Sequence, residues 1–246
     1  MAYIGETLSE ITPLLGQYRG KVSRNAMKEL SGKALADYKQ RLVLKPEQRH
    51  LIVGTILGDG FLRFPGRSHQ ANLTIDHGGV QKEYVWWKYE RLKDWVLTPP
   101  RQLSRVYHKD RTRTLVSWRF STISHLALTF CYKLFYRDGK KVIPMNIGDL
   151  VTHPLTLAVW LMDDGSKNQD VLFLSTQNFS TQEQEHLCRC LWKNFGIEST
   201  LNFHSISNGA RLYRVRLTRE GSKKAWQMVM PYIIPSLQYK FSAIPL

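Results

Sequence analysis

Two apolar stretches, each closed by an acidic residue and a glycine, dominate the hydrophobic pattern of this 246-residue chain. The first follows Pro46 and closes at Gly60, and the second begins at Pro154 and closes at Gly165. Proline suits the first turn of a helix, and glycine suits the position just after its end. The pattern therefore predicts two similar apolar helices, one in each half of the chain.

The elements predicted after each apolar helix come in the same order: a strand, a helix and a strand. We expect them at 71–76, 84–95 and 114–120 after the first helix, and at 171–176, 181–195 and 211–218 after the second. Two halves of one α+β design are the simplest description. The predicted domains are a basic N-terminal arm at 1–46, a first half at 47–150 and a second half at 151–246.

Two of the predicted strands separate charge from apolar side chains by strict alternation. Arg214 and Arg216 share one face of 211–218, with Val215 and Leu217 on the other. Residues 113–121 alternate in the same way, with Arg113, Ser117 and Arg119 opposite Val116, Trp118 and Phe120. Such alternation predicts a sheet with one face packed on helices and the other solvated and basic.

The net charge indicates the class of partner. Lysine and arginine number 35 and aspartate and glutamate 20, which gives +15 at pH 7. An excess of this size repels itself unless a polyanion is bound, so nucleic acid is the first expected partner. The apolar runs are far shorter than the roughly 20 residues that cross a bilayer, and no membrane partner is expected. Three cysteines without metal-binding spacing favour a reducing intracellular compartment, either an organelle (mitochondrion or chloroplast) or a prokaryotic cytoplasm.

Asp59 and Asp164 stand at the C-terminal ends of the two apolar helices, where the helix dipole disfavours negative charge. Carboxylates in this setting favour a hard cation such as Mg²⁺. Gly54 and Gly58 leave one face of the first helix bare, so the two helices can pack closely and bring Asp59 beside Asp164. Two acidic groups beneath a basic sheet surface predict metal-dependent phosphodiester hydrolysis.

The segments Ile52–Gly60 and Leu157–Gly165 resemble two copies of the LAGLIDADG motif. A chain with both copies resembles the single-chain homing endonucleases encoded in introns, and the resemblance covers roughly residues 47–241. It implies a pseudo-twofold pair of αββαββα halves with a saddle-shaped antiparallel sheet surface for double-stranded DNA. It also implies a monomer that makes a double-strand break with short 3′ overhangs at a long, imperfectly palindromic site.

The resemblance assigns roles to particular residues. Asp59 and Asp164 would hold Mg²⁺, for which Mn²⁺ can substitute, with the main-chain carbonyls of Gly58 and Asp163. Lys141 and Lys240 would lie near the two catalytic centres. Asp76 and His204 are candidates for polar groups behind the metal ligands. The side chains expected to contact DNA are Arg63, Asn72, Thr74, Arg113, Arg119, Arg214 and Arg216.

Two other functions fit the same motifs. An RNA-splicing maturase would bind intron RNA through a second basic surface, for which the stretch Arg19–Lys33 is a candidate. A catalytically inactive DNA-binding regulator would keep the fold, but such a protein has little reason to retain both Asp59 and Asp164. The intact acidic pair favours the endonuclease.

Overall fold

The computed structural model describes residues 32–65, 68–107 and 110–241. The chain divides into two units, Met1–Lys45 and Pro46–Leu246. The described part of the first unit contains helix α2 (Gly32–Arg41). Most of the predicted arm, with nearly all of its basic stretch Arg19–Lys33, lies outside the described residues.

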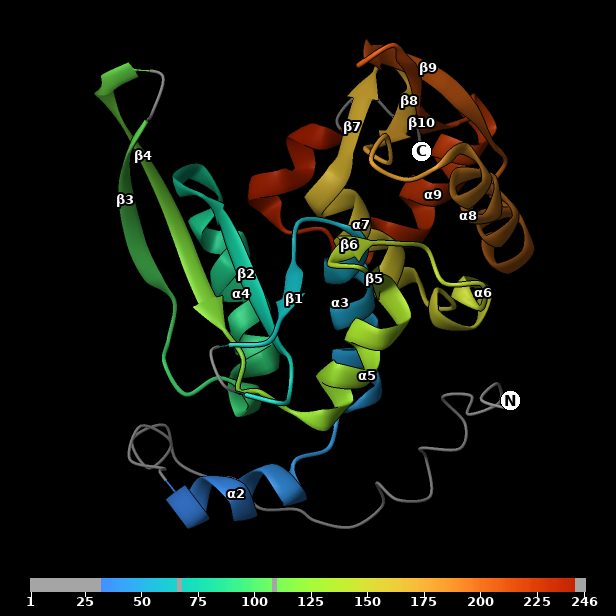
Figure 1. Cartoon of the computed structure of the whole chain (residues 1–246). Helices are drawn as coiled ribbons and strands as arrows, with labels where there is room; N and C mark the ends of the chain where they lie inside the picture. Colours follow the sequence, from blue (N-terminus) through green and yellow to red (C-terminus); the bar gives the residue numbers. More distant parts are fainter. Residues whose placement is uncertain (1–31, 66–67, 108–109, 242–246) are drawn as a thin grey trace. The chain divides into compact units, whose positions relative to one another are not determined.

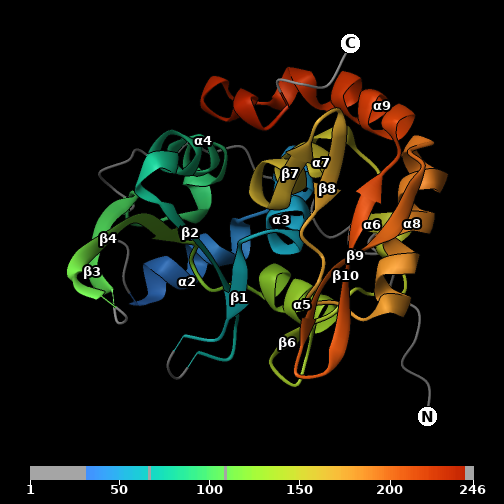
Figure 2. The same ribbon diagram turned by 90° about the horizontal axis from the view of Figure 1, so that it is seen from above.

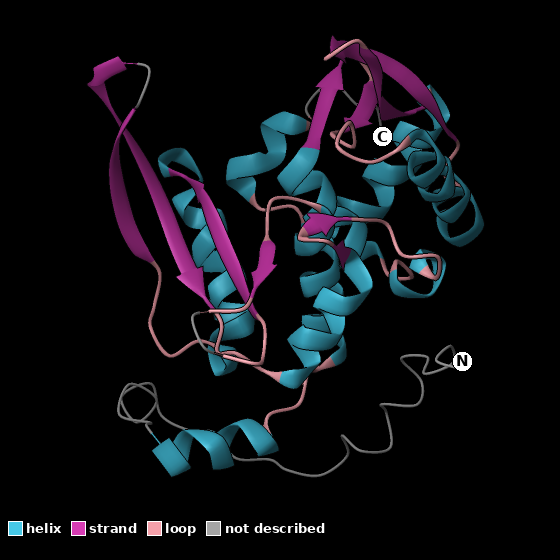
Figure 3. Ribbon diagram, in the orientation of Figure 1, coloured by secondary structure: helices cyan, strands magenta, loops and turns pink. Residues whose placement is uncertain are grey.

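The second unit contains two four-stranded antiparallel sheets with the same topology (Figures 1 and 3). The first has the order β1-β2-β4-β3 and the second the order β7-β8-β10-β9. This repeated order supports a division of the unit into two similar halves. The strands of the first sheet are β1 (Phe61–Arg63), β2 (Asn72–Gly78), β3 (Arg101–Tyr107) and β4 (Asp110–Ser121). Those of the second are β7 (Gly165–Asn168), β8 (Val171–Leu174), β9 (Ser199–Ser207) and β10 (Ala210–Leu217).

Helices α3 (Pro46–Leu57) and α7 (Pro154–Asp164) pack on each other between the two sheets (Figures 1 and 2). Helix α4 (Lys82–Leu92) packs on the first sheet, and α8 (Thr181–Phe195) and α9 (Arg219–Val229) pack on the second. The remaining elements are α5 (Leu126–Phe135), the hairpin of β5 (Tyr136–Arg137) and β6 (Lys140–Lys141), α6 (Ile147–Leu150) and the 3₁₀ turns η2 (Gly79–Gln81), η3 (Lys93–Trp95), η4 (Met230–Tyr232) and η5 (Pro235–Lys240). None of the helices in the described ranges is long and apolar enough to cross a membrane.

Local sequence signals explain the helix boundaries. Pro154 occupies the first turn of α7, and His153 caps it by accepting a hydrogen bond from the backbone N–H of Leu155 at 3.1 Å. Helix α8 spans the predicted residues and begins with a capping box between Ser180 and Glu183. The predicted helices and strands of both halves are confirmed, with shifts of a few residues at their ends.

The glycines that close the two apolar helices stand where there is no space for a side chain. Gly165 directly follows α7, as predicted, in an extended conformation with φ −72° and ψ 138°. A Cβ atom at Gly165 would lie 2.2 Å from the carbonyl oxygen of Leu161, and one at Gly60 would lie 2.8 Å from that of Thr55. Glycine is required because the chain turns back against its own helix, where a side chain has no space.

The bare face predicted for the first helix is confirmed. A Cβ atom at Gly54 would lie 2.5 Å from the carbonyl oxygen of Thr156, and one at Gly58 would lie 2.3 Å from Cβ of Asp163. At the opposite ends of the same helices, the rings of His50 and His153 stack with their centroids 4.6 Å apart. Helices α3 and α7 therefore run side by side in the same direction, and both end at the same place.

The predicted alternation on the strands is confirmed as well. Trp118 and Phe120 of β4 pack on Trp86 and Tyr89 of α4. In the second sheet, Val215 and Leu217 are fully buried, whereas Arg214 and Arg216 are half-buried on the other face of β10. Each sheet has one face on helices and one face that carries arginine.

Candidate active site

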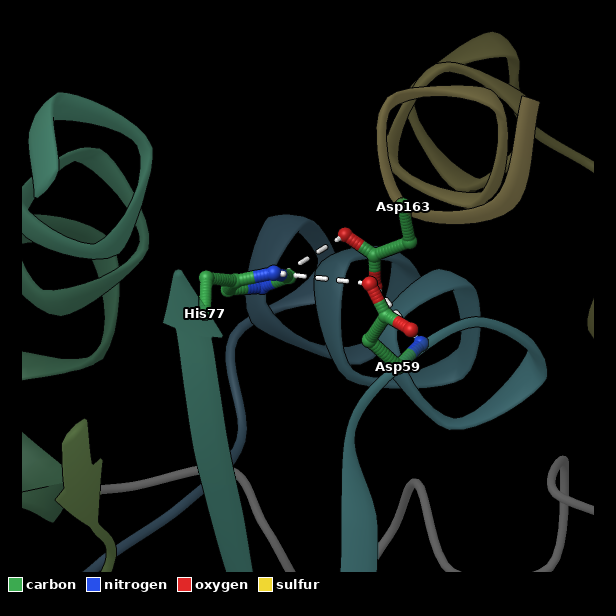
Figure 4. A group of neighbouring side chains, drawn as sticks. All are labelled: Asp59, His77 and Asp163. Atoms are coloured by element: carbon green, nitrogen blue, oxygen red, sulfur yellow. Dashed lines mark hydrogen bonds and ion pairs between the residues drawn. The ribbon is translucent and has the colours of Figure 1, made fainter. Parts of the chain in front are cut away.

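Three carboxylates meet where α3 and α7 end. Asp59 comes just after α3, and Asp163 and Asp164 are the last two residues of α7. The backbone N–H of Asp59 donates a hydrogen bond to Oδ2 of Asp163 at 3.2 Å, which ties the two helix ends together (Figure 4). The Asp59 side chain is 46% exposed and that of Asp163 is fully buried. The carboxylate of Asp59 is thus open to a ligand, while Asp163 lies beneath it.

Lys141 and Lys240 reach the same place from opposite halves. The ammonium group of Lys141, on β6, donates to the carbonyl oxygen of Gly58 at 2.6 Å. Lys240, at the end of η5, donates to the carbonyls of Met162 at 2.6 Å and Asp163 at 3.0 Å. The carbonyl oxygens of Gly58 and Asp163 are therefore oriented to accept a cation.

The pKa values of Asp59 and Asp164 are shifted in opposite directions. Burial raises the pKa of Asp164 to about 7, with further contributions from the negative charges of Asp59 and Asp163. Burial also acts to raise the pKa of Asp59, but the hydrogen bond and charge of His77 and the charges of Lys88 and Lys240 lower it overall. The positive charges of Lys141 and Lys240 act to lower the pKa of Asp164 but do not offset its burial and the two neighbouring carboxylates.

Two residues of the site, Lys88 and His77, were missed by the sequence analysis. Lys88 on α4 donates to both carboxylate oxygens of Asp163, at 2.7 and 2.9 Å, and is fully buried. Its pKa is lowered by burial, against the opposing effect of the Asp163 charge. A signal was present, because Lys88 falls among the apolar positions of its helix, four residues after Tyr84 and four before Leu92.

Among the described residues, no hydrogen bond joins Asp76 or His204, the two polar groups predicted behind the metal ligands, to Asp59, Asp163 or Asp164. Asp76 lies on the arginine-bearing face of the first sheet and accepts hydrogen bonds from Arg119 at 3.0 Å and Arg105 at 3.3 Å. Its neighbour His77 meets Asp59 instead, since consecutive residues of a strand face opposite sides. His204 is exposed at the register shift of β9, and no hydrogen bond or ion pair joins it to the three aspartates among the described residues.

The residues predicted to contact DNA fall into two groups. Arg63 is exposed at the end of β1, and Arg119, Arg214 and Arg216 are half-buried on the outer sheet faces. Arg214 lies over the ring of Phe173 at 4.1 Å. Two residues of the interior strand β2, Asn72 and Thr74, are buried, and the Thr74 hydroxyl is hydrogen-bonded to Ser121 at 2.9 Å. Their contact with DNA stays a prediction. Arg113 belongs to β4, but its side chain lies outside the described part of the structure.

The chain is similar to proteins from fungal and algal sources. It is 28% identical to "Probable intron-encoded endonuclease 1" of Wickerhamomyces canadensis over 221 residues, which cover 85% of this chain and 90% of that protein. It is 24% identical to "DNA endonuclease I-ChuI" of Chlamydomonas applanata, covering 81% and 96%. It is also 27% identical to "Cytochrome b mRNA maturase bI2" of Debaryomyces hansenii, covering 80% and 74%.

The fold has a close counterpart among solved structures. The structure titled "The homing endonuclease I-WcaI bound to its DNA recognition sequence" matches with a TM-score of 0.79 at 24% identity, over 92% of this chain and all of that one. The sequence model of the LAGLIDADG DNA endonuclease family matches residues 49–224, which include α7, most of α3 and the acidic ends of both helices. This chain belongs to the LAGLIDADG DNA endonuclease family.

Proposed function

We propose that this protein is a site-specific endonuclease that cuts both strands of one DNA duplex. The observation that carries the proposal is the meeting of Asp59 and Asp164 with Lys141 and Lys240 at the joint end of α3 and α7. Each half contributes one carboxylate and one lysine. Because one chain contains both sets, a monomer has a catalytic group for each strand.

A divalent cation fits the residues at this site. Asp59 and Asp164 would hold it, together with the carbonyl oxygens of Gly58 and Asp163, and such oxygen donors suit Mg²⁺. The raised pKa of Asp164, about 7, indicates that a bound cation would stabilise its ionised carboxylate. Magnesium, when bound, supplies Lewis acidity at the phosphate and lowers the pKa of a coordinated water.

The lysines have a separate role in the proposed reaction. Burial lowers the pKa values of Lys141 and Lys240, so each Nζ gives up a proton more readily than an exposed lysine does. Each Nζ also places an N–H donor at the helix ends, where the phosphate would bind. We propose that the two lysines orient a water molecule and balance the negative charge of the phosphate.

The basic sheet faces would bind the duplex, and Arg216→Ala tests this. Arg216 is half-buried on the outer face of β10, so its loss should weaken binding and lower the slope of log K against log salt by about one unit per lost phosphate contact. Fluorescence anisotropy across a salt series measures both. Arg214→Ala is a poorer test because it also removes the packing on Phe173. An unchanged affinity and slope would show that this strand does not face DNA.

The activity itself is tested by incubating the purified protein with a library of randomised DNA duplexes and Mg²⁺. We expect cutting at one long, imperfectly palindromic sequence with short 3′ overhangs, and no cutting when EDTA removes the metal. Parallel reactions with Mn²⁺ test whether it substitutes. Tight, salt-sensitive binding of DNA without any cutting would contradict the proposal.

RNA maturation is the second candidate, because one of the relatives bears the name of a cytochrome b mRNA maturase. The +15 charge suits RNA as well as DNA. Splicing of a self-splicing intron RNA, measured with and without the protein, separates this function from cleavage. Faster splicing by a protein with no nuclease activity would favour the maturase.

A further inference from the structure

A buried ion pair crosses between the two halves directly beneath Asp59. The Asp163 carboxylate belongs to α7 of the second half, yet its partners belong to the first half. They are Lys88 of α4, at 2.7 Å, and the backbone N–H of Asp59, at 3.2 Å. Both charged side chains are fully buried. An ion pair without solvent contact is costly to disturb, since removing one partner leaves an uncompensated buried charge.

His77 extends this pair to the carboxylate of Asp59. Its Nδ1 is 3.4 Å from Oδ2 of Asp59 (Figure 4). Its Nε2 is 3.3 Å from Nζ of Lys88. Lys88 is confined on its other side by the ring of Tyr84, at 4.4 Å. The buried contacts thus run from Asp163 through Lys88 and His77 to Asp59, and they fix both its backbone and its side chain.

Among the residues that the structure describes, the second half has no equivalent series of contacts. The residue that corresponds to Asp163 in the first motif is Gly58, which has no side chain to cross the interface. The strand pairings place Thr176 where His77 stands in the first half, and the Thr176 hydroxyl bonds Oε1 of Gln184 at 3.2 Å. In the described part of the chain, the carboxylate of Asp164 accepts no hydrogen bond.

We infer that Lys88 and His77 are positioning residues for Asp59 and not for Asp164. The catalytic centre for one DNA strand is then held by buried contacts that the centre for the other strand lacks. The inference rests on the proposed endonuclease function. His77 lies between Nζ of Lys88, at 3.3 Å, and Oδ2 of Asp59, at 3.4 Å. Among the described residues, no hydrogen bond or ion pair joins Lys88 or His77 to Asp164. Loss of Lys88 should therefore slow one strand cut and spare the other.

The test is single-turnover cleavage of the target duplex with a different dye on each strand. Lys88→Met should slow the strand served by Asp59 by about 10-fold to 100-fold, the usual cost of losing a group that orients a metal ligand. The other strand should be cut at nearly the original rate, so that a singly nicked duplex accumulates. The Mg²⁺ concentration for half-maximal cutting should rise for the slowed strand only.

Further variants separate positioning from folding. His77→Phe should slow the same strand as Lys88→Met. The double variant Lys88→Met with Asp163→Asn removes both buried charges and should show the same bias if the single variant does not fold. Gln48→Met is the matched control, because Gln48 is a buried polar residue that ties α3 to the far end of α4 through the carbonyl of Arg91 at 2.9 Å. It should lower the melting temperature without changing the ratio of the two strand rates.

These measurements distinguish a failure of the positioning role from a failure of the proposed endonuclease function. Equal slowing of both strands by every folded variant would overturn the positioning role and leave the endonuclease intact. A wild-type protein that cuts neither strand would overturn the endonuclease, and the inference with it. A bias toward one strand shared by the Lys88 and His77 variants and absent from Gln48→Met supports both.

Discussion

Asp59→Asn and Asp164→Asn should each abolish double-strand cleavage and leave DNA binding intact. Both side chains stand at the joint end of α3 and α7, and each would lose half of its oxygen donors for the cation. The loss should exceed the about 100-fold that follows from removing a group behind a metal ligand. Conversion of supercoiled plasmid to linear form measures this loss, and nicked circles reveal any single-strand cutting that survives.

Binding and cleavage respond in opposite ways to these two substitutions. Removing a carboxylate beneath a polyanion relieves repulsion, so the affinity for the target measured without metal should be unchanged or higher. Asp149→Asn is the matched control, because it removes the same charge at an exposed position of α6. Its cleavage rate should equal that of the wild type. Full double-strand cleavage by Asp59→Asn or Asp164→Asn would show that the cation is held elsewhere.

The sequence predicted the parts of this site that follow from local pattern. Two apolar helices that end in acidic residues, and the bare face at Gly54 and Gly58, need only periodicity and side-chain size. The positions of Lys141 and Lys240 came from resemblance to a family, and the structure brings both lysines to the helix ends. Nothing in the spacing of these lysines alone points to the aspartates, since the contacts join residues about eighty positions apart.

The sequence did not predict which neighbour of a strand residue faces inward. Asp76 and His77 are consecutive, and a shift of one position exchanges the outer face of β2 for the inner one. Thr74 lies between Phe61 of β1 and Ser121 of β4, and Ser121 comes from a segment 47 residues further along the chain. Lys88 was missed for another reason. A lysine on an apolar helix face is normally assigned to the surface, and its buried partners, Asp163 across the interface and His77 of β2, come from segments outside its helix.

Gly54→Ala should destabilise the protein and separate the two carboxylates. Alanine gains about 1 kcal/mol over glycine in an isolated helix. At Gly54, however, the new Cβ would lie 2.5 Å from the backbone carbonyl oxygen of Thr156 and 2.8 Å from Cβ of Val159. Backbone cannot rotate out of the way, so α3 and α7 must move apart, and overpacking of this kind costs about 1–3 kcal/mol or more. Chemical denaturation measures the loss.

Gly148→Ala is the control for this effect, since Gly148 is also helical and a Cβ there would meet no atom within 4 Å. It should be neutral or stabilising. Adding Val159→Ala to Gly54→Ala should recover little stability, because the closest obstacle is the Thr156 carbonyl and not the valine side chain. The cleavage rate should fall more than the stability loss explains, because the carboxylates and carbonyls sit on the helix ends that move. A Gly54→Ala variant as stable and active as Gly148→Ala would mean that the helix pair tolerates a wider separation than its contacts indicate.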